Sequence, residues 1–151
     1  MDVTRGTVIA LSVSDKKGER KTNVPEVRFI ENWGLAGDAH AGEWHRQVSL
    51  LALESIEKIR ALGLQVMPGD FAENITTSHV DLLRLQVGDR LRIGECRLEI
   101  TQIGKECHTR CAIYEQVGDC VMPREGLFAR VVRGGLMRVG DALERIENES
   151  D

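Results

Sequence analysis

The chain has no apolar run long enough to cross a membrane as a helix, and no proline-rich linker or internal repeat. Its N-terminal residues 1–15 contain too short an apolar stretch for a signal peptide and no small-residue cleavage site. Basic residues are not in excess, since 20 Lys and Arg stand against 24 Asp and Glu, for a net charge of −4. We therefore expect a cytoplasmic protein that binds neither membranes nor nucleic acid.

What is present is the composition of an ordinary globular domain. The chain has 151 residues, of which 42% are hydrophobic and 29% charged. A chain of this length buries roughly 70% of its unfolded surface, so it can fold without disulfides or a structural metal. In a reducing compartment its four cysteines are expected to be reactive or metal-binding rather than paired.

Short β-branched and alternating apolar runs, separated by glycine, predict a mainly β (α+β) fold. Residues 6–14 are expected to form a strand. Residues 80–104 are expected to form antiparallel hairpins divided at Gly88 and Gly94. Residues 127–147 form a further strand region interrupted by glycines. The pattern predicts one domain over residues 1–147, followed by a frayed acidic tail at 148–151.

One helix is predicted in the middle of the chain. Ser49 stands where an N-cap would be, and apolar residues recur from Leu50 at steps of three as far as Leu62. Gly63 is expected to end this helix.

The segment 104–120 holds three of the four cysteines. The neighbouring cations Lys105 and Arg110 would favour the thiolate form of Cys107 or Cys111, which is the nucleophilic form. The alternative is that these are buried thiols at the end of a strand. For the fourth cysteine, Cys96 in an alternating strand, we prefer that structural interpretation.

A zinc site is a second interpretation of the same segment. Four residues there could serve as zinc ligands, although they lack a tight Cys-x-x-Cys pair. An iron–sulfur cluster is less favoured, because its closely spaced cysteine runs are missing. The four residues are Cys107, His108, Cys111 and Cys120.

Arginine could provide an anion pocket, because its guanidinium binds phosphate through two hydrogen bonds. Residues 105–138 carry six basic residues against four acidic ones. Arg130, Arg133 and Arg138 are as well explained by ion pairs on a solvated face. We favour Arg46 and Arg110 for the pocket.

Five motifs, in order along nearly the whole chain, resemble those of the MOSC domain family, which is named after the C-terminal region of molybdenum cofactor sulfurase. They are "KKGERK" (Lys16–Lys21), "GLAGDAH" (Gly34–His40), "RQVSLL" (Arg46–Leu51), "PGDFAEN" (Pro68–Asn74) and "GDRLRIGECRLEITQIGKEC" (Gly88–Cys107).

The resemblance implies a MOSC-type twisted β-barrel with a few short helices and a working cysteine at one end. That cysteine would carry sulfur as a persulfide, or would hold the molybdenum of a pyranopterin cofactor. Cys107 is slightly favoured over Cys111 for the persulfide, and Cys107 would be the metal ligand. The residues expected to bind the cofactor are Lys105, Arg110, His40, Arg46 and Asn74. His40 and Asn74 could alternatively shape their loops, and Asp38 could form a turn with its own backbone.

The first functional expectation is a carrier of sulfane sulfur for metal–sulfur cofactor assembly. A cysteine desulfurase would donate the sulfur, and a molybdoenzyme or cofactor-synthesis protein would accept it. No pyridoxal phosphate is expected on this chain, which is too short to contain the domain that binds it. The alternatives are a molybdenum cofactor carrier or small reductase, with the pterin enclosed by a partner or in a homodimer, and a zinc-stabilised binding module without catalysis.

Overall fold

The computed structural model describes residues 5–16, 21–104 and 125–147. Within these ranges the chain is mostly strand, with one α-helix, α1 (Leu53–Arg60), and one 3₁₀ turn, η1 (Leu82–Arg84). The strands are β1 (Arg5–Val13), β2 (Thr22–Val24), β3 (Glu26–Ile30), β4 (Gly34–Leu35), β5 (Val48–Ala52), β6 (Ile75–Ser78), β7 (Arg90–Ile93), β8 (Cys96–Ile103), β9 (Leu127–Arg133), β10 (Gly135–Arg138) and β11 (Ala142–Ile146).

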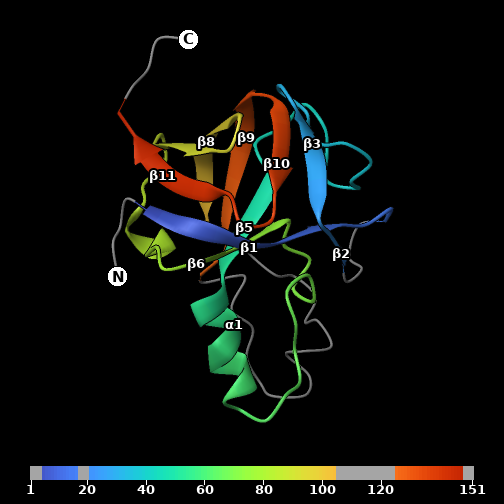
Figure 1. Cartoon of the computed structure of the whole chain (residues 1–151), viewed down its shortest axis with the longest axis vertical. Coiled ribbons are helices and arrows are strands. Elements are labelled where there is room, and N and C mark those ends of the chain that lie inside the picture. Colours follow the sequence, from blue (N-terminus) through green and yellow to red (C-terminus); the bar gives the residue numbers. More distant parts are fainter. Residues whose placement is uncertain (1–4, 17–20, 105–124, 148–151) are drawn as a thin grey trace.

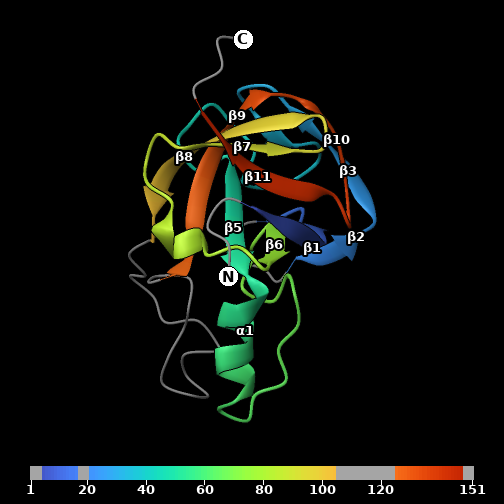
Figure 2. The same cartoon turned by 60° about the vertical axis from the view of Figure 1, so that its left-hand side comes forward.

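The main sheet closes on itself as a barrel (Figures 1 and 2). Its order is β11-β7-β8-β9-β5-β6-β1-β2, and a further pairing of β11 with β1 joins the ends of the first seven strands. Most neighbours are antiparallel, while β5 and β6 run parallel and are linked by α1. The predicted twisted β-barrel with few helices is confirmed. A small sheet in the order β10-β3-β4 lies beside the barrel at the upper right of Figure 1.

The barrel is filled by alternate residues of its strands, as expected where one face of a strand points inward. In β8, for example, Cys96, Leu98 and Ile100 are buried while the residues between them are partly exposed. Cys96 belongs to this apolar core, as predicted. Burial raises the pKa of its thiol to about 12, with Glu95 and Asp141 adding to the rise.

Helix α1 projects from one end of the barrel (Figures 1 and 2) and covers a second apolar cluster. Glu54 in its first turn and Lys58 and Arg60 in its last turn suit the helix dipole. The cluster consists of Leu51, Ile56, Ile59, Val66, Phe71 and Phe128. No helix in the described ranges has both the length and the apolar character needed to span a membrane.

The predicted helix start is wrong. Residues from Val48 to Ala52 form strand β5, and Ser49 makes no cap because it lies within the strand. Both faces of β5 are buried, since Leu50 lies in the barrel core and Leu51 in the second cluster. A strand buried on both faces reads as a continuous apolar run, which periodicity cannot separate from a helix.

The hairpin predictions are confirmed in part. Strands β7 and β8 pair antiparallel around Gly94, and residues 127–147 divide at the predicted glycines into β9, β10 and β11. The run before Gly88 is not a strand, because Leu82–Arg84 form the turn η1.

Candidate functional site

A lysine and an aspartate are buried as an ion pair at the end of β1. Lys21 precedes β2, Asp38 follows β4, and the Lys21 Nζ–Asp38 Oδ1 distance is 2.7 Å. Both side chains have no exposed surface. A buried ion pair persists only where further hydrogen bonds satisfy both ions. The surroundings of this pair therefore decide what it does.

The ammonium of Lys21 has three hydrogen-bond partners. Besides Asp38, it donates to Ser14 Oγ at 3.1 Å and lies 2.9 Å from His40 Nδ1. An ammonium has three donors, so all of them are used within the protein.

Both carboxylate oxygens of Asp38 also accept hydrogen bonds from the backbone. Its Oδ1 also accepts from the backbone N–H of Ser14 at 3.0 Å, and its Oδ2 accepts from that of His40 at 3.1 Å. Burial alone would raise the pKa of Asp38. The hydrogen bond and charge of Lys21, with hydrogen bonds from Ser14 and the Asn74 side chain, outweigh burial and hold it below its usual value. The hydrogen bond from the N–H of His40 to Asp38 Oδ2 forms the local turn that the sequence predicts for Asp38.

Asn74 connects this cluster to the barrel. Its Oδ1 accepts from the backbone N–H of Ser49 at 3.0 Å and from Ser49 Oγ at 3.1 Å. Its Nδ2 donates to the carbonyl oxygen of Ser12 at 3.1 Å. Asn74 is fully buried and thus ties β1 and β5 to the loop that carries it. Its role in the structure is to position other groups.

The loop before Asn74 is shaped by a buried carboxylate. Glu73 Oε2 accepts from Gly69 N and from Thr76 Oγ1, both at 2.9 Å, and Oε1 accepts from Phe71 N at 3.2 Å. Burial raises the pKa of Glu73, although these hydrogen bonds oppose the rise. Gly69 has φ +96°, and a Cβ there would lie 2.6 Å from the carbonyl oxygen of Lys21. Only glycine permits this close approach.

Arg46 extends the cluster with an aromatic-stacked cation. Trp44 Nε1 donates to the carbonyl oxygen of His40 at 2.8 Å. The guanidinium carbon of Arg46 lies 5.1 Å from the Trp44 ring centroid and 5.7 Å from that of Phe128. Within the described ranges, its buried Nε has no hydrogen-bond partner. A guanidinium stacked on two rings with an unused donor is suited to an anionic ligand.

The loop that carries Arg46 touches both strands that flank residues 105–124. Thr101 Oγ1 on β8 donates to the carbonyl oxygen of His45, and Phe128 on β9 packs against Arg46. The two strand ends are held together there, since Gly104 N donates to the carbonyl oxygen of Gly126 at 2.6 Å. The Arg46 loop thus contacts β8 and β9, the two strands that flank the cysteine segment in the chain.

Three of the predicted site residues are therefore brought together. The Asn74 side chain helps to lower the pKa of Asp38, Asp38 accepts from the N–H of His40, and Arg46 stacks on the Trp44 whose indole donates to His40. The other four predicted site residues, Lys105, Cys107, Arg110 and Cys111, lie outside the described residues, as do His108 and Cys120. In the part of the chain that is described, no group of three or more His, Cys, Asp or Glu residues could hold a metal.

Sequence reasoning missed Lys21 as a site residue. The motif "KKGERK" includes it, but three lysines there are equivalent by sequence alone. What distinguishes Lys21 is its burial in the folded protein, because lysine is almost never fully buried unless it is paired.

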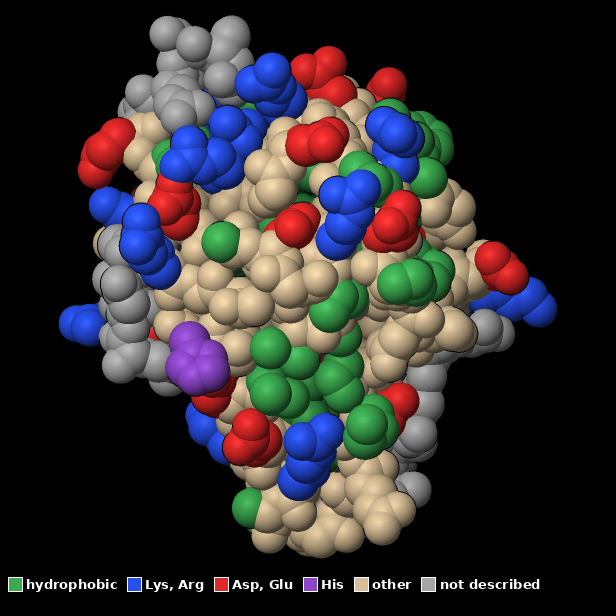
Figure 3. All heavy atoms as spheres, in the orientation of Figure 1, with side chains coloured by type: hydrophobic (Ala, Val, Ile, Leu, Met, Phe, Trp, Pro, Cys, Tyr) green, Lys and Arg blue, Asp and Glu red, His purple; other side chains and the backbone are tan. Residues whose placement is uncertain are grey.

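Arg130 and Arg138 form ion pairs at the surface, as the alternative interpretation of the sequence predicts. Arg130 Nε lies 2.8 Å from Glu99 Oε1, and Arg138 Nε lies 3.5 Å from Glu26 Oε1. On the face in Figure 3, basic and acidic side chains are interspersed over the barrel. This mixture does not make a field of one sign on that face.

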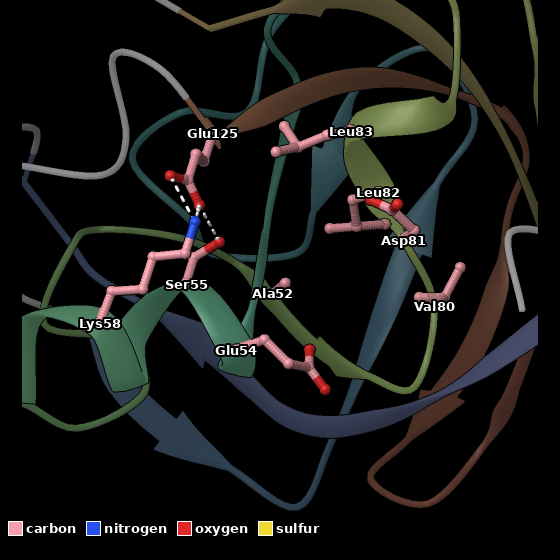
Figure 4. Close-up of a pocket in the computed structure, with 9 residues that line it drawn as sticks. All are labelled: Ala52, Glu54, Ser55, Lys58, Val80, Asp81, Leu82, Leu83 and Glu125. Atoms are coloured by element: carbon pink, nitrogen blue, oxygen red, sulfur yellow. Dashed lines mark hydrogen bonds and ion pairs between the residues drawn. The ribbon is translucent and has the colours of Figure 1, made fainter. Parts of the chain in front are cut away.

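A separate pocket of about 150 Å³ lies between α1 and the turn η1 (Figure 4). Within it, Ser55 Oγ donates to Glu125 Oε1 at 2.6 Å, and Lys58 Nζ lies 2.9 Å from both Glu125 carboxylate oxygens. None of the residues predicted for the site lines it. Its contacts anchor Glu125, where the described chain resumes, to helix α1. The complete lining is Ala52, Glu54, Ser55, Lys58, Val80, Asp81, Leu82, Leu83 and Glu125.

Comparisons with known proteins agree with the architecture. The family model described as "MOSC domain" matches residues 37–144. The crystal structure of the YuaD protein from Bacillus subtilis is similar with a TM-score of 0.78 and 20% identity, covering 93% of this chain and 95% of that one. YiiM from Escherichia coli has a TM-score of 0.68 and 21% identity, covering 97% and 72%. YiiM from Geobacillus stearothermophilus has a TM-score of 0.70 and 18% identity, covering 94% and 75%. No curated protein matches the chain significantly.

Proposed function

Because the chain belongs to the MOSC domain family, we propose that it carries sulfane sulfur as a persulfide on a cysteine of residues 105–124, Cys107 ahead of Cys111. The thiolate attacks the terminal sulfur of a donor persulfide, such as that of a cysteine desulfurase. A new S–S bond forms, the donor's S–S bond breaks, and the donor leaves as its own thiolate. The acceptor would be a metal–sulfur cofactor during its assembly.

One observation supports this proposal beyond family membership. The loop that holds Arg46 contacts both strands between which the cysteine segment runs, through Thr101 on β8 and Phe128 on β9, and Arg46 brings a cation there. Cations and N–H donors next to a thiol favour its thiolate, which is the reactive form.

The experiment is intact-mass spectrometry before and after incubation with a cysteine desulfurase and cysteine. We expect a gain of one sulfur atom that reductant removes and that Cys107→Ser abolishes. Cys96→Ser is the matched control and should load normally, since Cys96 lies in the barrel core. Loading that survives Cys107→Ser but is lost in Cys111→Ser moves the site to Cys111. Loading that survives in the variant lacking both cysteines contradicts the proposal.

Binding of a pyranopterin cofactor is the second candidate, and the stacked Arg46 favours it. Its unpartnered buried Nε fits the phosphate of such a cofactor, and Cys107 would be the residue on the metal. When bound, the molybdenum would supply redox chemistry. Elemental analysis and pterin fluorescence of the purified protein test this, with Arg46→Gln expected to lose cofactor and Arg130→Gln to retain it. One zinc per chain instead would favour the zinc-stabilised module.

A further inference from the structure

The contacts of Lys21 determine which ring nitrogen of His40 can carry a proton. Lys21 Nζ is 2.9 Å from His40 Nδ1, and it is 2.7 Å from a carboxylate that keeps it charged. A charged ammonium has no lone pair, so in this contact it can only donate. His40 Nδ1 must therefore be the acceptor, and it has no hydrogen of its own.

A neutral imidazole whose Nδ1 accepts has its hydrogen on Nε2. The doubly protonated ring is disfavoured by geometry, because an N–H at Nδ1 would point at the ammonium. The backbone of His40 is fixed as well, because its N–H donates to Asp38 and its carbonyl oxygen accepts from the Trp44 indole. The ring is therefore fixed in place with one defined tautomer.

We infer that Lys21 and Asp38 are positioning residues that hold His40 as the neutral Nε2–H tautomer, so that His40 acts in the site as a hydrogen-bond donor. The His40 side chain is 24% exposed, whereas those of Lys21 and Asp38 are fully buried. Of these three side chains, only that of His40 reaches the surface. A donor of this kind fits an electron-rich sulfur or oxygen atom.

The identity of the acceptor rests on the proposed function, in which it is the thiolate or persulfide sulfur. The tautomer does not rest on that function, because it follows from the contacts of Lys21 alone. The two parts can therefore fail separately.

The test is long-range ¹H–¹⁵N NMR of the four histidines at neutral pH, with His40 assigned by the His40→Gln variant. In the wild type we expect His40 Nδ1 to resonate as an unprotonated nitrogen and Nε2 as a protonated one. In Lys21→Met, the Asp38 carboxylate remains beside Nδ1, with its Oδ2 3.9 Å away. A carboxylate attracts a proton, so Nδ1 should then become protonated.

Lys58→Met is the matched control. It also removes a lysine from an ion pair, but one whose lysine side chain is 62% exposed, and it should leave the His40 spectrum unchanged. A wild-type His40 with hydrogen on Nδ1, or a Lys21→Met spectrum identical to wild type, overturns the inference. If Lys21→Met does not fold, the wild-type spectrum alone decides the tautomer. Sulfur loading that shifts the Nε2–H signal supports the acceptor, and loading without a shift overturns that part only.

Discussion

The buried Lys21–Asp38 pair predicts a pattern of stability losses that a surface pair would not show. Removing one member of a buried ion pair typically costs about 3–5 kcal/mol, because the other charge is left unpaired. Lys21→Met leaves Asp38 with the N–H groups of Ser14 and His40 and the Asn74 side chain. We therefore expect a loss of about 3–5 kcal/mol, or a fall in Tm of roughly 6–20 °C for a chain of this size.

Asp38→Leu should cost more than Lys21→Met. It leaves the charge of the ammonium uncompensated. It also leaves two backbone N–H groups without an acceptor, and each buried unsatisfied group costs about 1–3 kcal/mol of stability. In the double variant the unpaired charge is gone but the two N–H groups remain. Its loss should be about 2–6 kcal/mol, clearly less than the sum of the single losses.

Urea unfolding of the wild type, both single variants and the double variant measures these losses, provided the m-values agree. Lys58→Met is the reference for a solvent-exposed pair, since the Lys58 side chain is 62% exposed. Such a pair contributes about 0–1 kcal/mol. A Lys21→Met loss no larger than that of Lys58→Met, or additive losses in the double variant, would refute the reasoning.

Three further predictions follow from individual contacts. Because burial raises the pKa of Cys96 to about 12, its thiol should resist iodoacetamide in the folded protein and react once urea unfolds it, as mass mapping would show. Gly69→Ala should destabilise the protein by about 1–3 kcal/mol, because φ is +96° and the new Cβ meets the Lys21 carbonyl; equal urea midpoints would contradict this. Since the pKa of Asp38 is lower folded than unfolded, its stabilising effect is present above the unfolded value and is lost as pH falls through the folded one. The stability gap between wild type and Asp38→Asn should therefore shrink with acidification and not with alkalinisation.

The sequence predicts most of the barrel because its strands alternate. Strand β8 buries Cys96, Leu98 and Ile100, and glycines mark the ends of β9 and β10. The sequence of strand β5 predicts a helix because its two faces pack into two different apolar clusters. Short-range patterns show that a residue is apolar, but they do not show which element will cover it.

The sequence predicts only some of the residues that the structure brings together in the candidate site, for a related reason. His40, Arg46 and Asn74 were identified through motifs, and their loops are indeed adjacent. Lys21 was not, since its importance depends on Asp38, which is 17 residues away and reaches it only in the folded barrel. Contacts of this kind are properties of topology and leave no local pattern.

The energetics of the cluster indicate what it is for. A buried ion pair is rarely more stable than well-packed apolar residues of the same volume. The two charges of Lys21 and Asp38 therefore contribute little to stability that an apolar pair could not, and the loss expected in the double variant comes from the two backbone N–H groups that lose their acceptor. What an apolar pair could not do is fix the backbone of residues 14, 38 and 40 through hydrogen bonds and direct a lone pair of His40 inward. The hydrogen bonds of the cluster thus fix the geometry of these residues, while its two charges add little to stability. Replacing the pair with apolar residues should therefore weaken the proposed sulfur loading, measured by intact mass, even in a background where other substitutions have restored global stability.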